Sequence, residues 1–204
     1  MVIRRRADLC LSTRCDSRAY TRAPIEETIH GFLALRTKEG RVLAVGDLFQ
    51  VVRGDRLTTR LLFGFKDGAV GDETAVFSQR GNFQLMTDRH IQKGPSFPHP
   101  MDLSIDVRSE QVTVRSTEKD GKEDVKNDHL DLPPDVYNGM ILSIVKNIRP
   151  ETKVSMIVST PKPRLVKLAI SPRGEEPFSL VGSQRKAMRD EIKMWEVSRG
   201  WWHP

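Results

Sequence analysis

Turn-forming residues recur about every 8–12 positions between His30 and Leu130, and this spacing constrains the fold more than any other feature of the sequence. Between the turns, apolar and polar residues alternate with a period of two, as in residues 103–107. Period two is typical of strands with one buried and one solvated face. Asp67 and Gly68 form a tight-turn signal, because Gly readily adopts the positive φ that hairpin turns require. The pattern predicts an antiparallel meander.

The predicted strands follow from the same alternation, and Gly46 is a candidate β-bulge between the second and the third of them. They cover residues 31–36, 41–45, 47–53, 57–65, 73–79, 83–87, 103–107, 112–115, 123–130, 154–159, 165–170 and 178–181.

One segment carries a helical pattern, with a proline (Pro134 and Pro150) near each end. We expect a helix over about 134–147 whose apolar face covers one side of the sheet. Gly139 is unfavourable inside a helix, by roughly 1 kcal/mol relative to Ala. Either the helix starts after Gly139, or this small residue allows close approach to the sheet. The apolar residues at helical spacing are Val136, Met140, Ile141, Ile144, Val145 and Ile148.

Composition excludes several classes of protein. A hydrophobic share of 38% with 29% charged residues supports a packed core and argues against wholesale disorder. No apolar run reaches the roughly 20 residues that cross a bilayer as a helix. Two cysteines cannot form a disulfide-dense scaffold. The predicted fold is therefore mainly β (α+β): a curved antiparallel meander or half-barrel with one main helix packed on its face.

The net charge of +6 is unevenly distributed along the chain. Residues 1–29, 30–182 and 183–204 each carry +2, so the long middle segment is almost balanced. A sequence-independent nucleic-acid binder needs a basic stripe, and we expect no nucleic-acid partner. The expected organisation is an irregular leader over 1–29, an antiparallel β domain with its helix over 30–182, and an atypical tail over 183–204.

The best functional candidate is the segment 87–100, which is interpreted as a loop held extended by its prolines. Read as a site, it offers histidines that titrate near neutral pH and bind metals. Its spacing fits no zinc or hydrolase signature, so no metal ligand or catalytic residue is assigned. A purely structural loop is the alternative. The candidate ligand-binding residues in this segment are Asp88, His90, Lys93, Ser96 and His99.

Three further residues complete the candidate ligand site. Asp131 is a residue that the fold could bring to the same loop, and Asn138 and Met140 lie on the predicted helix. A curved sheet over an apolar helix can enclose a lipid-sized cavity, to which methionines offer an adaptable lining. Ordinary core packing explains the same residues.

Several stretches together resemble a family of uncharacterised bacterial proteins that are expected to be exported and β-rich. They cover roughly 30–187, and include residues 30–33, 65–68, 73–79, 92–97, 132–135 with 138–139, and 160–164. The resemblance implies an architecture similar to the periplasmic lipoprotein-carrier half-barrels. It also implies a periplasmic or otherwise exported location, although no signal peptide is readable after Arg4–Arg6.

The chain departs from this family at both ends. Members begin with a signal peptide and continue beyond Lys193 with a Gly-rich β segment, whereas this chain ends in residues 200–204, which include Trp201 and Trp202. A shift of one base would restore ordinary strand sequence there. We therefore expect a frameshifted or truncated C-terminus, an N-terminus altered in a similar way, and an unpaired sheet edge.

These observations favour a non-enzymatic cell-envelope protein. It would bind a lipid or other apolar ligand, or an envelope protein partner, by its curved sheet, and it would need no cofactor. The alternative is a metal-dependent or hydrolytic enzyme that uses the loop carrying His90 and His99.

Overall fold

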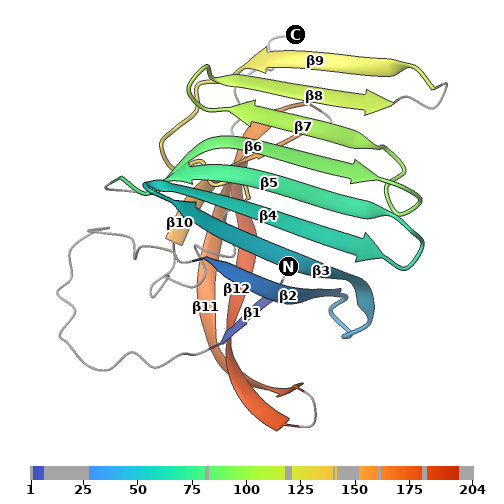
Figure 1. Cartoon of the computed structure of the whole chain (residues 1–204), viewed down its shortest axis with the longest axis vertical. Coiled ribbons are helices and arrows are strands. Elements are labelled where there is room, and N and C mark those ends of the chain that lie inside the picture. Colours follow the sequence, from blue (N-terminus) through green and yellow to red (C-terminus); the bar gives the residue numbers. More distant parts are fainter. Residues whose placement is uncertain are drawn as a thin grey trace.

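Eight consecutive strands form one antiparallel sheet in sequence order, as the turn spacing predicts (Figure 1). We call it the main sheet. The computed structural model describes residues 2–6, 28–80, 83–117, 121–139, 141, 152–159, 162–180 and 183–197. The strands of the main sheet are β2 (Ile29–Arg36), β3 (Val42–Arg53), β4 (Arg56–Phe65), β5 (Val70–Ser78), β6 (Gln84–Lys93), β7 (Met101–Asp106), β8 (Gln111–Thr117) and β9 (Glu123–His129).

The predicted hairpin at Asp67 and Gly68 is confirmed between β4 and β5. Gly68 has φ +84°, which an L side chain adopts only with strain. The Asp67 carboxylate accepts a hydrogen bond of 3.0 Å from the Ala69 backbone N–H. Local turn chemistry of this kind sets the register of the flanking strands.

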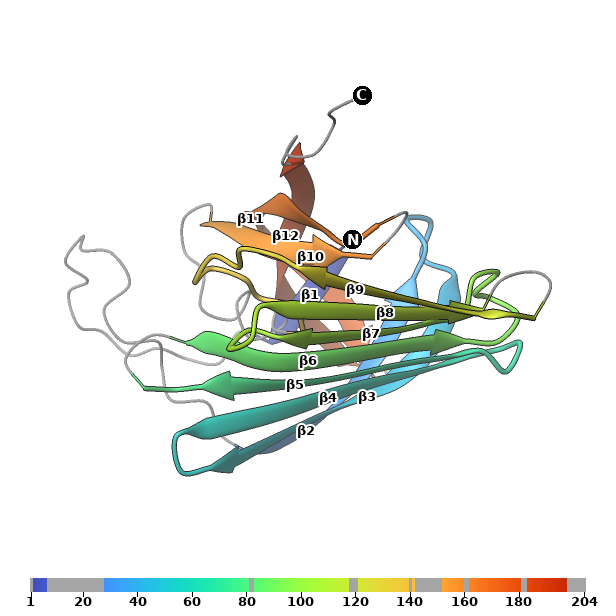
Figure 2. The ribbon, with the colours of Figure 1, turned by 90° about the horizontal axis from the view of Figure 1, so that it is seen from above.

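A second sheet crosses one face of the main sheet (Figure 2). Its strands lie in the order β1–β12–β11–β10, and every pairing between them is antiparallel. We call the main-sheet face toward it the inner face, and the opposite one the outer face. The second-sheet strands are β1 (Val2–Arg6), β10 (Thr152–Val158), β11 (Arg164–Leu180) and β12 (Ser183–Val197).

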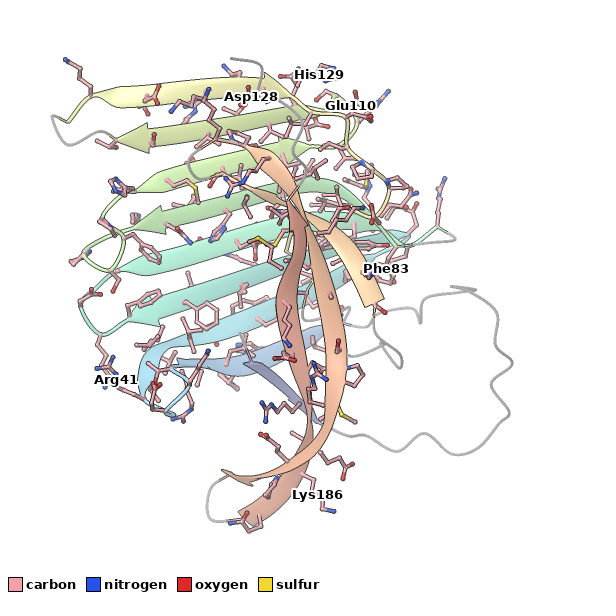
Figure 3. The ribbon with its side chains drawn as sticks, turned by 180° about the vertical axis from the view of Figure 1, so that it is seen from behind. Arg41, Phe83, Glu110, Asp128, His129 and Lys186 are labelled. Atoms are coloured by element: carbon pink, nitrogen blue, oxygen red, sulfur yellow. The ribbon has the colours of Figure 1, made fainter. Side chains whose placement is uncertain are left out.

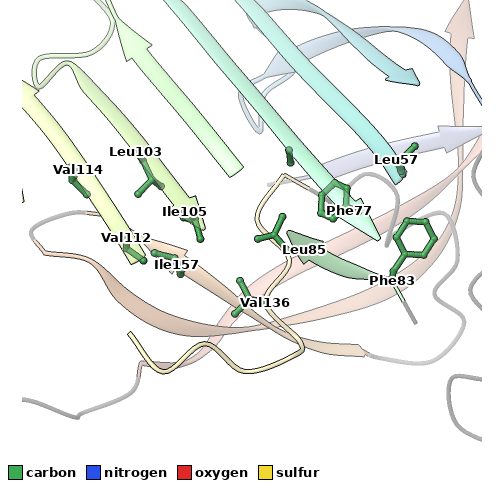
Figure 4. Packing of buried hydrophobic residues seen from close by; sticks show 11 residues of the cluster. Leu57, Phe77, Phe83, Leu85, Leu103, Ile105, Val112, Val114, Val136 and Ile157 are labelled. Atoms are coloured by element: carbon green, nitrogen blue, oxygen red, sulfur yellow. The ribbon is translucent and has the colours of Figure 1, made fainter. Parts of the chain in front are cut away.

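The principal core joins the inner face to the second sheet (Figure 4). Phe77 of β5 and Leu57 of β4 are fully buried in it. The opposing side chains are Ile157 of β10 and Val136. Val136 belongs to the segment between β9 and β10, residues 130–151, which we call the linking segment. Apolar burial at these positions is therefore what holds the two layers together. The other cluster members are Ala75, Phe83, Leu85, Leu103, Ile105, Val112 and Val114.

The prediction of a main helix is wrong, and with it the α+β fold class. Among the described residues, 134–139 form turns and a bridge in which Val136 pairs with Ser155 of β10. Gly139 has φ +70°, which no right-handed helix contains. The rest of the predicted helix, Met140 and residues 142–147, lies outside the described part of the chain. What covers the inner face is the second sheet, and the main sheet is not closed as a barrel, because β2 and β9 end its strand order.

The long strands also differ from prediction. β3 runs through Gly46 without a register shift against β4, so the predicted bulge there is absent. β11 is one strand of 17 residues, and its register against β12 shifts twice, between Lys167 and Leu168 and between Pro172 and Glu175, around Gly174. Its partner β12 begins at Ser183, so the boundary expected at residue 182 falls within the β11–β12 hairpin.

Charged and polar side chains lie close together in pairs at the ends of both sheets (Figure 3). Lys186 lies near the tip of the β11–β12 hairpin, 3.7 Å from the Glu175 carboxylate. His129, at the end of β9, lies 3.6 Å from the carboxylate of Glu110 in the β7–β8 turn. These side chains are exposed, and such pairs contribute little to stability.

Candidate functional site

Two carboxylic acids lie side by side on the inner face of the main sheet. Glu73 of β5 pairs in register with His90 of β6, and Ala75 pairs with Asp88. Because alternate residues of a strand share a face, Glu73, Asp88 and His90 all point toward the second sheet. We call Glu73 and Asp88 the acid pair.

Burial dominates the electrostatics of the acid pair. Glu73 retains some exposed area, but protein surrounds its carboxyl closely enough that desolvation raises its pKa to about 7. Asp88 is only 1% exposed. Desolvation, and then the charge of Glu73, raises the pKa of Asp88 to about 8, against a small opposing effect of the Arg89 backbone N–H. Near neutral pH, Asp88 therefore favours its protonated form, and Glu73 is close to its titration midpoint.

The acid pair lacks the counter-charge that buried carboxylates ordinarily have. Neither Asp88 oxygen has a partner at hydrogen-bonding geometry among the described residues. No cationic side chain contributes to the pKa of Glu73 or of Asp88. An unpaired buried carboxylate is costly, so protonation is the state that this environment tolerates.

Gly139 closes the site from the second-sheet side. Its backbone N–H donates a hydrogen bond to the Glu73 carboxylate. A Cβ placed on Gly139 would lie 2.6 Å from the Ala75 Cβ, 3.4 Å from Asp88 Oδ1 and 3.6 Å from Glu73 Cδ. The backbone of the linking segment therefore rests directly on the acid pair, and a side chain at position 139 would prevent that contact.

The linking segment is fastened to β10 beside the acid pair. Asn138, 2% exposed, donates from Nδ2 to the Ile157 carbonyl and accepts the Ile157 N–H at Oδ1. Asp135 accepts hydrogen bonds from Ser155 Oγ (2.9 Å) and Lys167 Nζ (3.2 Å). The segment thus bridges the acid pair on one side and β10 and β11 on the other.

His90 neighbours the acid pair as a neutral group. Burial lowers its pKa, and the charge of Asp72 on the outer face only partly opposes this. Its Nε2 lies 3.3 Å from the Gln92 amide nitrogen. His90 is therefore a poor source of positive charge for Glu73 or Asp88 above neutral pH.

The structure brings together Asp88, His90 and the Asn138–Gly139 turn, but not the other predicted site residues. Lys93, Ser96, His99 and Asp131 are exposed. Ser96 donates a 2.6 Å hydrogen bond to Asp67, which explains it as a loop anchor. Met140 lies outside the described residues.

The interpretation of 87–100 as one loop is wrong for its first half. Residues up to Lys93 belong to β6, and only 94–100 form a loop. Polar residues on the inward positions of β6 mask its alternation, because Asp88, His90 and Gln92 stand where apolar residues are expected.

Sequence reasoning missed Glu73, the second member of the acid pair. The signal was present, because strict alternation through 73–77 places Glu73 on the face of Ala75 and Phe77. A charged residue in phase with a core phenylalanine indicates a buried acid.

A second region of interest lies on the outer face, at the β2 edge. Phe32 is 81% exposed and Val45 is 63% exposed. The His30 ring stacks on Phe49 with centroids 4.3 Å apart, and its Nε2 lies 2.7 Å from Asp47 Oδ1. We call these apolar and aromatic residues the β2–β3 patch: His30, Phe32, Val45, Phe49 and Val51.

A shallow polar depression of about 350 Å³ adjoins this patch on the same face. Phe49, Arg60, Thr74 and Arg89 pair successively across β3–β6, so the patch and the depression share one row of the sheet. Asp72 accepts two hydrogen bonds from Arg60, of 3.0 and 2.7 Å. The lining residues are Arg60, Asp72, Thr74, Arg89 and Ile91.

Neither region contains a metal centre. Within the described ranges, no group of three or more His, Cys, Asp or Glu side chains could hold a metal ion. His90 and His99 do not form such a group with an acid. No helix among the residues described is long and apolar enough to cross a bilayer.

Comparison of the chain with protein-family models, with curated proteins and with solved structures finds no match.

Proposed function

We propose that this protein is a non-enzymatic binding protein of the cell envelope that takes a lipid with an anionic headgroup on its outer face. The observation that carries the proposal is the β2–β3 patch, in which Phe32 is 81% exposed, lies opposite Asp47, and has the exposed Val45 and Phe49 as diagonal neighbours on the same face. Contiguous exposed apolar groups of this kind mark ligand or partner sites. The envelope location rests on the family resemblance.

The core argues for the outer face over an internal cavity. Leu57, Phe77, Val136 and Ile157 fill the space between the sheets, where the sequence suggested a lipid-sized cavity. An acyl chain therefore finds its apolar contacts at Phe32, Val45 and Phe49 instead.

The neighbouring depression favours an anionic headgroup. Arg60 and Arg89 flank Thr74 in the same row, and Arg115 adds a third positive charge beside Asp102. These three arginines face the carboxylates of Asp72 and Asp102, and Asp47 adds a third within the patch, so the arginines offer guanidinium hydrogen-bond donors to an anionic headgroup and not a net positive charge.

Binding of a fluorescent long-chain fatty acid tests the proposal, with the matching fatty alcohol as headgroup control. We expect saturable binding of the acid, weaker binding of the alcohol, and loss of both with the double variant Phe32→Ser/Phe49→Ser. Val125→Ser is the matched control, because Val125 is 45% exposed on the same face at the opposite edge. Equal binding by the Phe32→Ser/Phe49→Ser protein, or none by the wild type, would overturn the proposal.

A further inference from the structure

We propose that Glu73 and Asp88 form a pH-operated latch, which holds the linking segment and the second sheet against the main sheet while both carboxyls are protonated and loosens when they ionise. The proposal goes beyond ligand binding and concerns the opposite face of the main sheet.

The acid pair lies between the backbone of Gly139 and that of β5 and β6. Asp88 is 1% exposed, and Glu73 and Asp88 both lie within 4 Å of the position that a Gly139 Cβ would take. Behind them stands the hydrogen-bonded backbone of β5 and β6. Full hydration of the Asp88 carboxyl therefore requires the backbone at Gly139 to move away, whereas Glu73 keeps some exposed area.

Among the described residues, the elements packed around the acid pair supply no positive charge that lowers the pKa of either acid. The inward neighbours in register are Leu61 of β4 and Leu103 and Ile105 of β7, none of which titrates. His90 of β6 favours its neutral form. The covering layer carries charged groups that include Asp131 and Asp135 of the linking segment, Lys153 of β10, Lys167 and Glu176 of β11, and Arg189, Asp190, Glu191 and Lys193 of β12, and none of the layer's charged side chains contributes to the pKa of either acid.

Hydrogen bonds of the linking segment connect the acid pair to β10. Asn138 precedes Gly139 and is bound to Ile157 of β10 through both side-chain amide groups. Tyr137 donates its N–H to the Ser155 carbonyl, and Ser155 donates its N–H to the Asp135 carbonyl. A movement that hydrates the acid pair therefore pulls on β10, which carries Ile157 of the principal core.

The sign follows from proton linkage. In the open state the two carboxyls meet water and ionise at their ordinary pKa values near 4. In the closed state their pKa values are about 7 and about 8. Closing therefore takes up protons. Between about pH 4 and the pKa that an acid has in the closed state, each acid makes opening up to about tenfold easier for every unit by which the pH rises.

Hydrogen exchange of the Tyr137 and Ile157 backbone amides measures the latch directly, because both amides are hydrogen-bonded across the junction. After correction for the intrinsic rate, we expect exchange of both to accelerate at least about tenfold between about pH 6 and about pH 9. The Leu48 amide, in β3 two strands away from Glu73 in the same row of the main sheet, serves as internal reference. Unchanged protection at Tyr137 and Ile157 across this range would overturn the latch.

Isosteric variants identify the groups responsible. Glu73→Gln/Asp88→Asn should abolish the acceleration, Asp88→Asn should reduce it to the part that Glu73 contributes, and Asp102→Asn should retain it in full. Asp102 is the matched control because it lies on the outer face, where Arg89 lowers its pKa. The same acceleration in Asp88→Asn as in the wild type contradicts the assignment.

Carbon-13 NMR titration of the wild-type carboxyls keeps the proposal testable if a variant fails to fold. Resonances of Glu73 and Asp88 that titrate near neutral pH support the latch. Titration of both below about pH 5 overturns it.

Discussion

Asn138 bonds to Ile157 as a neighbouring strand would: its amide donates to the Ile157 carbonyl at 3.0 Å and accepts the Ile157 N–H at 2.9 Å. One side chain thus satisfies both backbone groups of a buried residue in β10. It does so at the point where the linking segment turns onto the acid pair.

Replacement of Asn138 by alanine should therefore lower the free energy of unfolding by about 2–4 kcal/mol, because both backbone groups of Ile157 lose their partner in a buried setting. Urea denaturation provides the measurement. Asn127→Ala is the control, since Asn127 only accepts an exposed hydrogen bond from Thr113, and it should cost less than about 1 kcal/mol. An equal cost for both variants would refute this role of Asn138.

Gly139→Ala should be considerably more damaging than Gly174→Ala. Both glycines have positive φ, +70° and +90°, so both variants carry about 1–2 kcal/mol of backbone strain. A Cβ at position 174 meets no atom within 4 Å, whereas one at 139 meets the Ala75 Cβ at 2.6 Å. Thermal denaturation should show the difference, and Ala75→Gly should restore part of the stability lost in Gly139→Ala. Equal losses in the two single variants would contradict the close approach.

The stability of the protein should decrease as pH rises from about 6 to about 9. Glu73 and Asp88 have raised pKa values, so their stabilising contribution is complete below the ordinary pKa and is lost through about 7 and about 8. Asp72 and Asp102 act in the opposite direction, because Arg60 and Arg89 lower their pKa values and their contribution is lost on acidification. Urea denaturation midpoints measured across the pH range test both effects. A midpoint urea concentration that increases toward pH 9 would refute the loss of stability above neutral pH.

Two phenylalanines should separate folding from binding. Phe77 is fully buried in the principal core, and Phe77→Ala should cost about 3–5 kcal/mol. Phe32 is 81% exposed, and Phe32→Ala should change stability by less than about 0.5 kcal/mol while weakening fatty-acid binding. A Phe32→Ala protein that is destabilised as strongly as Phe77→Ala would place Phe32 in the core and remove the basis for a surface site.

The sequence is sufficient to predict the meander, because its strands pair with their neighbours in the chain and glycine turns such as Gly68 mark the connections. It misleads at 134–139, the described start of the predicted helix. Val136 packs in the core from a turn, and Gly139 adopts a positive φ under contact with Ala75. These roles depend on long-range contacts that periodicity does not record.

The candidate site could likewise be predicted from the sequence only in part. Asp88, His90 and Asn138 can be selected from the sequence as chemically interesting, but their neighbourhood depends on the register between β5 and β6 and on the path of the linking segment. Lys93 and His99 lie close to His90 in sequence, yet they are exposed in or beside the following loop. Glu73 lies 15 positions before Asp88 in the chain and is its nearest acidic partner in the fold.

The sequential strand order of the main sheet has a kinetic consequence. Each hairpin from β2 to β9 can close as soon as its two strands are available, whereas β10 can dock only after the meander offers its inner face. Until that docking event, Glu73 and Asp88 remain in water and ionised at neutral pH. The late phase of folding is therefore the one that consumes protons near neutral pH, and its rate should depend on pH in that range.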